Sequence, residues 1–173
     1  MTTNEIYFFS GPAAYAKVFE NNRDKEGYQG AYKAHDGMYT IMVGLNEKDA
    51  DTLYSFNRRY EPKDASKFAG VDTKAHKGRQ FFPFRRKHAS FNKKGEVIAA
   101  ISGPPNVIDH KGDPWDPKVM IGNGSMVTVK TTVSRDGNKT YVRLEGVRVD
   151  ELVPYTGSGS AEVRQEPETG LPF

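Results

Sequence analysis

Aromatic and cationic side chains are most densely mixed in the segment "RQFFPFRRKHASF", which begins at Arg79. Aromatic rings can stack on unpaired bases, at about 1–3 kcal/mol per base, while Lys and Arg contact the phosphates of the same strand. The alternative is that the phenylalanines are core residues and the arginines are merely solvated. Both can hold in a strand, because successive side chains point to opposite faces. The segment predicts a nucleic-acid-binding strand in which one set of phenylalanines is buried, and its candidate contacts are Arg79, Phe81, Phe84, Arg85, Arg86 and Lys87.

Further candidates of the same two types lie elsewhere in the chain. Some share a face of a predicted strand, some follow a predicted helix, and one lies in a proline-rich loop. Each also has an ordinary interpretation, since arginines can complete a helix end and a single aromatic ring can belong to a core. These additional candidates are Tyr15, Lys17, Arg58, Arg59, Tyr60, Lys77, Trp115 and Lys130.

The charge of the chain is unevenly distributed. Residues 58–94 contain twelve Lys and Arg but only three acidic residues, a local charge of +9, although the whole chain carries only +3. After Thr156 the acidic residues Glu162, Glu166 and Glu168 outnumber the basic Arg164. Such a separation favours a polyanionic partner over simple solubility.

Catalytic and metal-binding patterns are weak by comparison. The sequence has no phosphate-binding GxxxxGK[ST] loop, no HExxH and no GxSxG, and it contains no cysteine. Asp109, Asp113 and Asp116 could bind Mg²⁺ in a nuclease. However, aspartates beside Gly and Pro usually form turns, and this interpretation is favoured. We therefore predict a protein that is not an enzyme and that has no cofactor and no metal site.

The elements expected around these residues are short strands. Residues 13–19 alternate, with Ala14, Ala16 and Val18 on one face, and residues 38–45 alternate again. Asn46 can cap a helix that runs to about residue 57. Residues 61–78 form a lysine-rich, mobile loop, and Pro83 in the strand that follows argues for a sheet edge or a bulge.

The second half of the chain continues this pattern. The sequence predicts a turn at "NKKG", a strand over residues 96–101 and an ordered proline-rich loop after it. A strand over residues 125–131 and the hairpin turn "RDGN" follow. The apolar phase changes between Leu144 and Val147, so Gly146 marks a β-bulge. The resulting fold class is mainly β, an oligonucleotide-binding (OB) barrel of five or six antiparallel strands with one helix.

The last residues of the sequence are typical of a flexible segment. We expect the barrel domain to span residues 1–156 and a flexible, acidic tail to span residues 157–173. The tail closes with Leu171, Pro172 and Phe173, an apolar tip that can dock into a partner's hydrophobic pocket beside a cation. The alternative is a frayed terminus, for which evenly polar residues would be more typical.

Several blocks of the sequence resemble a known family. "GPPNVIDHKGDP", "IGNGSMVTVK" and "YVRLEGVRVDELV" are similar to successive C-terminal blocks of the single-stranded DNA-binding proteins of tailed phages. "GPAAYAKVFE" and "GMYTIMVGL" resemble the first blocks of that family, so the likeness covers most of the chain up to about Tyr155. "GLPF" further resembles the "PF" tips of bacterial single-stranded DNA-binding proteins, although Arg164 makes this tail less acidic than theirs.

The resemblance implies a non-enzymatic OB barrel that coats single-stranded DNA without strong sequence preference during phage replication, recombination and strand annealing. It also implies a C-terminal tail that contacts phage replication proteins, namely the polymerase and the helicase-primase, often within a homodimer. Because no apolar run approaches about 18 residues, no membrane span is predicted, and we expect the protein in the cytoplasm of the infected bacterial host. A nuclease that uses the Asp109 loop, an RNA-binding role, and a virion or adaptor barrel that acts only through its tail remain open alternatives.

Overall fold

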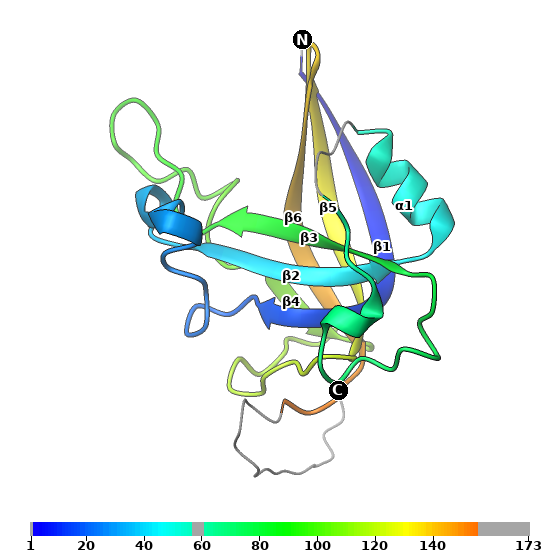
Figure 1. The fold of residues 1–173 in the computed structure, drawn as a ribbon. Coiled ribbons are helices and arrows are strands. Elements are labelled where there is room, and N and C mark those ends of the chain that lie inside the picture. Colours follow the sequence, from blue (N-terminus) through cyan, green and yellow to red (C-terminus); the bar gives the residue numbers. More distant parts are fainter. Residues whose placement is uncertain (1, 57–60, 156–173) are drawn as a thin grey trace.

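The structure is a computed structural model that describes residues 2–56 and 61–155. These ranges are mainly β, with six strands in one sheet and a single α-helix. The order across the sheet is β3-β2-β1-β5-β6-β4 (Figure 1). None of the helices in the described ranges is long and apolar enough to cross a membrane. The elements are β1 (Thr2–Lys17), β2 (Met38–Leu45), α1 (Glu47–Tyr54), β3 (Gln80–Lys87), β4 (Asn106–Asp109), β5 (Met126–Asp136) and β6 (Lys139–Glu151), with 3-10 helices at Tyr28–Gly30, Lys33–His35 and Ala65–Lys67.

β1 is long enough to belong to both halves of the sheet. Its first part pairs with β5 and its last residues pair with β2, both antiparallel. The strand bends at Tyr15, whose φ is 48°, and the β1–β2 register shifts between Ala14 and Lys17. A β-carbon at Gly11 would lie 1.9 Å from the carbonyl oxygen of Gly44, so only glycine allows the two strands to cross this closely.

The structure corrects the prediction for this strand in two respects. β1 begins at Thr2 rather than at residue 13. The predicted face of Ala14, Ala16 and Val18 is wrong, because the irregularity near Tyr15 breaks the alternation. Ala13 and Ala14 are both buried as a result, whereas Ala16 is only partly buried.

The alternation predicted for β2 and the helix start that follows are both confirmed. Tyr39, Ile41, Val43 and Leu45 are all 0% exposed and form one wall of the core. Asn46 then caps α1, because its Oδ1 accepts a hydrogen bond from the backbone N–H of Asp49 at 2.8 Å. Ala50 and Leu53 are also buried, so the helix packs one side onto the barrel.

β5 and β6 form the predicted hairpin. They pair up to the turn at 136–139, where Gly137 has a φ of 62°. Lys130 faces Gly146 but Thr131 faces Leu144, so Glu145 is the extra residue of a β-bulge, as the change of apolar phase predicted. Because of the bulge, β6 presents apolar side chains to the core on both sides of it.

β3 ends the sheet on one side, which confirms the sheet-edge interpretation of Pro83. Lys63 forms a single bridge with Phe81 at this edge. Farther along, β3 faces β6, and the side chain of Arg86 crosses to the carbonyl oxygen of Leu144 at 3.3 Å. A side chain, rather than a backbone ladder, thus joins β3 to β6.

Two predictions for the middle of the chain are wrong. β4 runs parallel to β6, so the sheet is not entirely antiparallel. Residues 96–101 do not form a strand, and only one bridge, between Phe91 and Val97, follows the predicted turn. The bridge does not extend into a ladder, because the chain turns back to the end of β3. There the backbone N–H of Gly103 donates a hydrogen bond to the carbonyl oxygen of Lys87, at 3.0 Å.

The loop between α1 and β3 covers part of the outer surface of β2 and β3. Ala65, Phe68 and Val71 from this loop are buried against Phe81 and Ala14, in a second small core outside the barrel. The segment is a loop, as predicted, but three of its side chains anchor it to the sheet. Phe81 faces away from the main core and is nevertheless buried.

Candidate nucleic-acid interface

The outer surface of β2 and β3 carries a row of exposed cations. Arg85 faces Thr40 across the β2–β3 ladder, and Lys17 faces Thr40 across the β1–β2 ladder. Directly paired residues in antiparallel strands point to the same side, so Lys17 and Arg85 share one face, about 10 Å apart. Lys87, opposite Met38, continues this row. We call the exposed residues Lys17, Arg85 and Lys87 the basic face.

The cations of the basic face have no acidic partners in the part of the chain that the structure describes. Within residues 2–56 and 61–155, none of the three takes part in an ion pair, although all are exposed. Such cations can bind phosphates without first breaking a contact inside the protein. Each phosphate that they neutralise releases counterions, which is the main source of affinity for a nucleic-acid backbone.

A cleft of about 360 Å³ opens beside this face, between β3 and the first half of β6. Its walls combine cations with apolar side chains. The ring of Tyr141 is 55% exposed there, on the same strand as Arg143. The cleft is lined by Met38, Arg85, Arg86, Lys87, Ser90, Ile101, Thr140, Tyr141, Val142 and Arg143.

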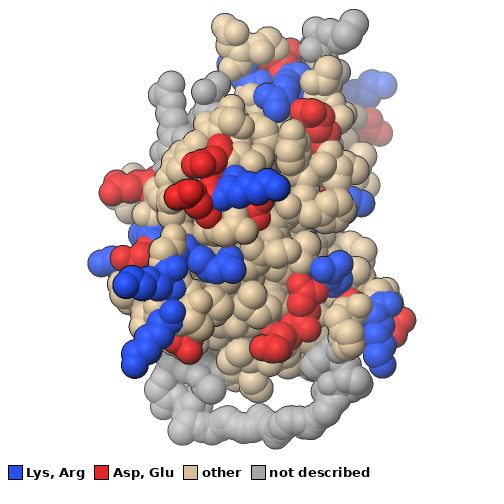
Figure 2. All heavy atoms as spheres, turned by 90° about the vertical axis from the view of Figure 1, so that its right-hand side faces the viewer, with Lys and Arg blue, Asp and Glu red and all other residues tan. Residues whose placement is uncertain are grey.

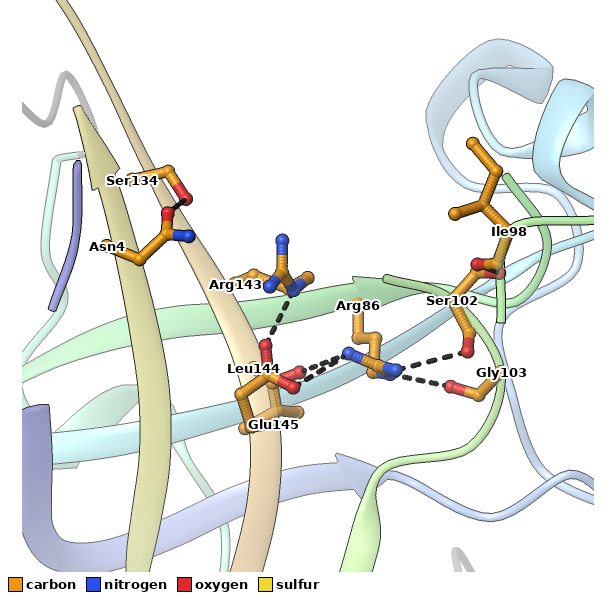
Figure 3. A network of polar contacts seen from close by, with 9 residues as sticks. All are labelled: Asn4, Arg86, Ile98, Ser102, Gly103, Ser134, Arg143, Leu144 and Glu145. Atoms are coloured by element: carbon orange, nitrogen blue, oxygen red, sulfur yellow. Dashed lines mark hydrogen bonds and ion pairs between the residues drawn. The ribbon is translucent and has the colours of Figure 1, made fainter. Parts of the chain in front are cut away.

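Arg86 forms the floor of this cleft and has a structural role. Its Nε donates to the carbonyl oxygen of Gly103 at 2.8 Å and its Nη2 to that of Ser102 at 3.1 Å. Its Nη1 donates to the Leu144 carbonyl and pairs with Glu145 at 3.2 Å (Figure 3). Burial lowers the pKa of Arg86, and Glu145 partly opposes that shift. The predicted DNA contact by Arg86 is thus corrected, since every nitrogen of its guanidinium binds a protein oxygen.

Glu145 is shared between two arginines. Arg143 Nε donates to its Oε2 at 2.6 Å while Arg86 holds its Oε1 (Figure 3). Two guanidinium groups therefore face one carboxylate, and the cluster keeps an excess positive charge beside Tyr141.

The phenylalanines of β3 are not available for stacking. Phe81 and Phe82 are 0% exposed and Phe84 is 2% exposed. Phe82 and Phe84 belong to the main core, and the 61–79 loop covers Phe81. The prediction that Phe81 and Phe84 contact DNA is therefore wrong, because both sides of this strand segment are buried.

Trp115 is also buried rather than exposed to a ligand. It is 6% exposed, and its Nε1 donates to the Val119 carbonyl at 2.9 Å. A ring packed in this way cannot stack on a base, so Trp115 is removed from the predicted contacts.

Other predicted residues lie near the basic face or apart from it. Tyr15 is 53% exposed and contacts Phe68 edge-on, at 5.4 Å between ring centroids, close to Lys17. Arg79 is tied to the sheet, because its Nη1 donates to the Gly44 carbonyl at 2.9 Å. Lys77 is exposed on the 61–79 loop, whereas Lys130 lies on the outer surface of β5, opposite Phe8. Outside the described residues lie Arg58, Arg59, Tyr60, Leu171, Pro172 and Phe173.

Sequence reasoning missed Tyr141 and Arg143. A usable signal was present, because Val142 and Leu144 were assigned to the inner face of the last strand, and strand alternation then places Tyr141 and Arg143 outside. What the sequence did not indicate is that this part of β6 lies opposite β3.

The aspartates that suggested a nuclease form turns. Asp109 Oδ1 accepts the backbone N–H groups of Lys111 and Asp113, at 2.8 and 3.0 Å. Asp116 Oδ1 accepts that of Lys118 at 2.9 Å. Among the described residues, no group of three or more His, Cys, Asp or Glu side chains is arranged to hold a metal ion. The turn interpretation accounts for both carboxylates.

The side of the molecule that carries α1 has a different charge pattern. Figure 2 shows Lys and Arg side chains there interspersed with Asp and Glu, without one continuous basic area. A phosphate backbone would meet both signs of charge on this side. The basic face differs in that, among the described residues, none of its three cations takes part in an ion pair.

Five strands, β1, β2, β3, β5 and β6, define an OB-type barrel, with β4 added beside β6. In this class the surface of the second and third strands, together with the loops after strands one and four, binds oligonucleotides. These loops correspond here to residues 18–37 and to the turn after β5, so the basic face and the cleft occupy that location.

Comparison with solved structures finds a similar fold. The crystal structure of gp2.5, a single-stranded DNA binding protein encoded by bacteriophage T7, matches with a TM-score of 0.51 at 19% sequence identity. The match covers 98% of this chain and 100% of that one. No protein-family model and no curated protein sequence matches the chain.

Proposed function

We propose that the chain is a phage single-stranded DNA-binding protein that holds DNA on the basic face and in the adjoining cleft. The observation that supports this most strongly is the set of exposed cations Lys17, Arg85 and Lys87, which form no ion pair with any described residue and lie beside the exposed ring of Tyr141. Its location on an OB-type barrel, and the fold shared with the phage T7 protein, support the same proposal.

Each part of the site has a distinct role in this proposal. Lys17, Arg85 and Lys87 contact successive phosphates, and Tyr141 stacks on a base that turns into the cleft. Stacking depends little on which base is present, so the protein binds without strong sequence preference. Binding of this kind fits the coating of DNA during phage replication and recombination in the host cytoplasm.

A titration of fluorescently labelled oligothymidylate tests the proposal. The variant Arg85→Glu/Lys87→Glu should lose affinity about 100-fold, at about tenfold for each reversed charge. Its matched control is Lys111→Glu/Lys118→Glu, which changes the net charge equally in an exposed loop away from the cleft. Equal losses in the two variants would show that only net charge matters, and the proposed site would be wrong.

Salt and competitor experiments define the ligand. The logarithm of the affinity should fall with the logarithm of the salt concentration by about 0.7 for each phosphate neutralised. The double reversal at 85 and 87 should flatten that slope, since two contacts are gone. Parallel titrations with RNA and duplex DNA of the same length then rank the three ligands, and tighter binding to RNA or duplex would contradict the assignment.

The tail is the second part of the proposal. Leu171, Pro172 and Phe173 recruit replication partners, the polymerase and the helicase-primase, through their apolar side chains. Removing Phe173 should abolish a pull-down of these partners while leaving oligonucleotide affinity unchanged. A truncated protein that still captures them would refute this role.

A homodimer completes the proposed set of partners. The outer surface of β1, β5 and β6 exposes Ile6 (57%) and Phe8 (62%) next to each other, an apolar area that solvated sheet faces seldom carry. We expect a second copy to contact it. Phe8→Ser should therefore lower the mass measured by light scattering to that of a monomer, and an unchanged mass would exclude this surface as the contact.

A further inference from the structure

After β3 the chain leaves the barrel as a projecting, hydrogen-bonded loop, residues 90–103, which we call the finger (Figure 1). Phe91 and Val97 bridge its two arms. Asn92 organises the tip, because its Oδ1 accepts the N–H groups of Lys94 at 2.9 Å and Glu96 at 3.0 Å. The finger is thus held in shape by its own hydrogen bonds.

The base of the finger is fixed to the floor of the cleft. Arg86 donates to the carbonyl oxygens of Ser102 and Gly103, and Ser102 Oγ donates to the Ile98 carbonyl at 2.8 Å (Figure 3). The arginine that joins β3 to β6 therefore also positions the finger. Any group on the finger keeps a defined place relative to the cleft.

The finger exposes apolar and cationic side chains to solvent. Phe91 is 52% exposed and Val97 is 57% exposed, although they bridge the two arms. Lys93 and Lys94 at the tip are exposed, and neither forms an ion pair within the described parts of the chain. An exposed ring beside unpaired cations repeats, on a smaller scale, the composition of the cleft.

The finger and the cleft are continuous. Ser90 and Ile101, one from each arm, line the cleft together with Arg85, Lys87 and Tyr141. A strand that follows the basic face through the cleft therefore reaches Phe91 next.

We propose that the finger is a second contact site for the same single strand, in which Phe91 stacks on a base beyond the one at Tyr141 and Lys93 and Lys94 contact the adjoining phosphates. This inference rests on the proposed function and lengthens its site. DNA is favoured over a protein partner because the only acidic residue of the finger, Glu96, already accepts a hydrogen bond from Asn92 Nδ2 at 3.2 Å. The tip thus presents a net positive charge to its partner.

Oligonucleotide length provides the test. Single OB folds occupy about 4 to 16 nucleotides, so oligothymidylates of about 4 and about 16 residues report on the cleft alone and on the cleft with the finger. Phe91→Ala should weaken binding of the longer oligomer about tenfold, because it removes one stacking contact of ordinary strength. Binding of the shorter oligomer should weaken less than about twofold. Phe91→Trp should restore the longer oligomer to the wild-type affinity.

The control is Tyr155→Ala, which removes a ring of similar exposure (59%) that does not line the cleft and does not belong to the finger. It should change neither affinity. Equal losses for both oligomers in Phe91→Ala, or no loss for either, would overturn the inference. In both cases normal binding by the wild type and weakened binding by Arg85→Glu/Lys87→Glu would leave the proposed function standing. Failure of the wild type to bind any oligomer would refute both.

Discussion

The basic face and the outer surface of β1, β5 and β6 have similar compositions but different electrostatics. Each has exposed cations close to an exposed ring. Tyr141 lies beside the basic face, where the outer side of β6 borders the cleft, and Phe8 lies farther along the same side of the β1–β5–β6 sheet. On the outer surface, however, Arg148 Nε donates to Asp150 at 2.6 Å, and Asp150 also accepts a hydrogen bond from Thr128. On the basic face the cations have no such partners within the described residues.

The difference shows that counting cations does not locate a nucleic-acid site. A phosphate competes poorly for an arginine that already has a carboxylate, whereas it gains the full interaction from an unpaired one. Polar groups that satisfy one another, as Ser10, Thr128 and Asp150 do, can instead be covered by a protein partner without losing their hydrogen bonds. The two surfaces are therefore suited to different partners.

The largest expected effect separates Arg86 from its neighbour Arg85. Arg86→Met should lower the free energy of unfolding by about 3 kcal/mol, because Ser102, Gly103 and Leu144 lose a buried donor and Glu145 loses one partner. Arg85→Met should change it by about 0.5 kcal/mol or less, as expected for an exposed side chain. Urea denaturation measures both. Similar stabilities would contradict the structural role of Arg86.

The next effect compares the two exposed rings. Tyr141→Ala should weaken binding to a short oligothymidylate about tenfold, within the range of one stacking contact, and Tyr141→Phe should retain the affinity. Phe8→Ala removes a ring of comparable exposure from the outer surface and should leave the affinity unchanged. If Phe8→Ala had the larger effect in this titration, the DNA site would be centred on Phe8 rather than on the cleft.

A smaller effect should follow when a paired arginine is freed. Glu145→Gln removes the carboxylate that Arg143 and Arg86 share, and it should raise DNA affinity about twofold to threefold through one additional phosphate contact. Asp150→Asn changes the charge equally but frees Arg148 on the outer surface, where no change is expected. Oligonucleotide titrations at fixed salt distinguish them, and equal gains would show that ion pairing does not separate the surfaces.

The smallest effect concerns His35. Burial and, to a lesser extent, Lys87 lower the pKa of His35. A phosphate bound to Lys87 offsets that repulsion and should raise the pKa, so binding takes up protons and becomes slightly tighter as the pH falls below about 6.5. Proton NMR titration of His35 with and without oligothymidylate measures this directly. In Lys87→Ala the pKa should be higher without DNA, and DNA should not raise it further.

Local features of the fold were predictable from the sequence. The alternation of β2, the Asn46 cap, the turn at Gly137 and the bulge beside Gly146 each depend on a few neighbouring residues and are confirmed. The direction of β4 and the missing strand at residues 96–101 were not predictable in this way, because strand pairing depends on distant segments.

The candidate site was predicted only in part for the same reason. Arg85 and Lys87 follow from strand alternation, and the structure places both on an exposed surface. Phe81 points to the same side of β3 as Arg85 and Lys87, but the loop that precedes β3 in the chain covers it. Tyr141 belongs to the cleft only because β6 lies opposite β3, and no local pattern in either segment encodes that proximity.

The burial of Trp115 has a practical consequence for optical assays. It is the only tryptophan in the chain, it is packed in the core, and it does not line the cleft. Its fluorescence should therefore report unfolding faithfully while changing little when an oligonucleotide binds. A flat emission signal during a DNA titration would say nothing against binding, and a labelled ligand is the appropriate probe.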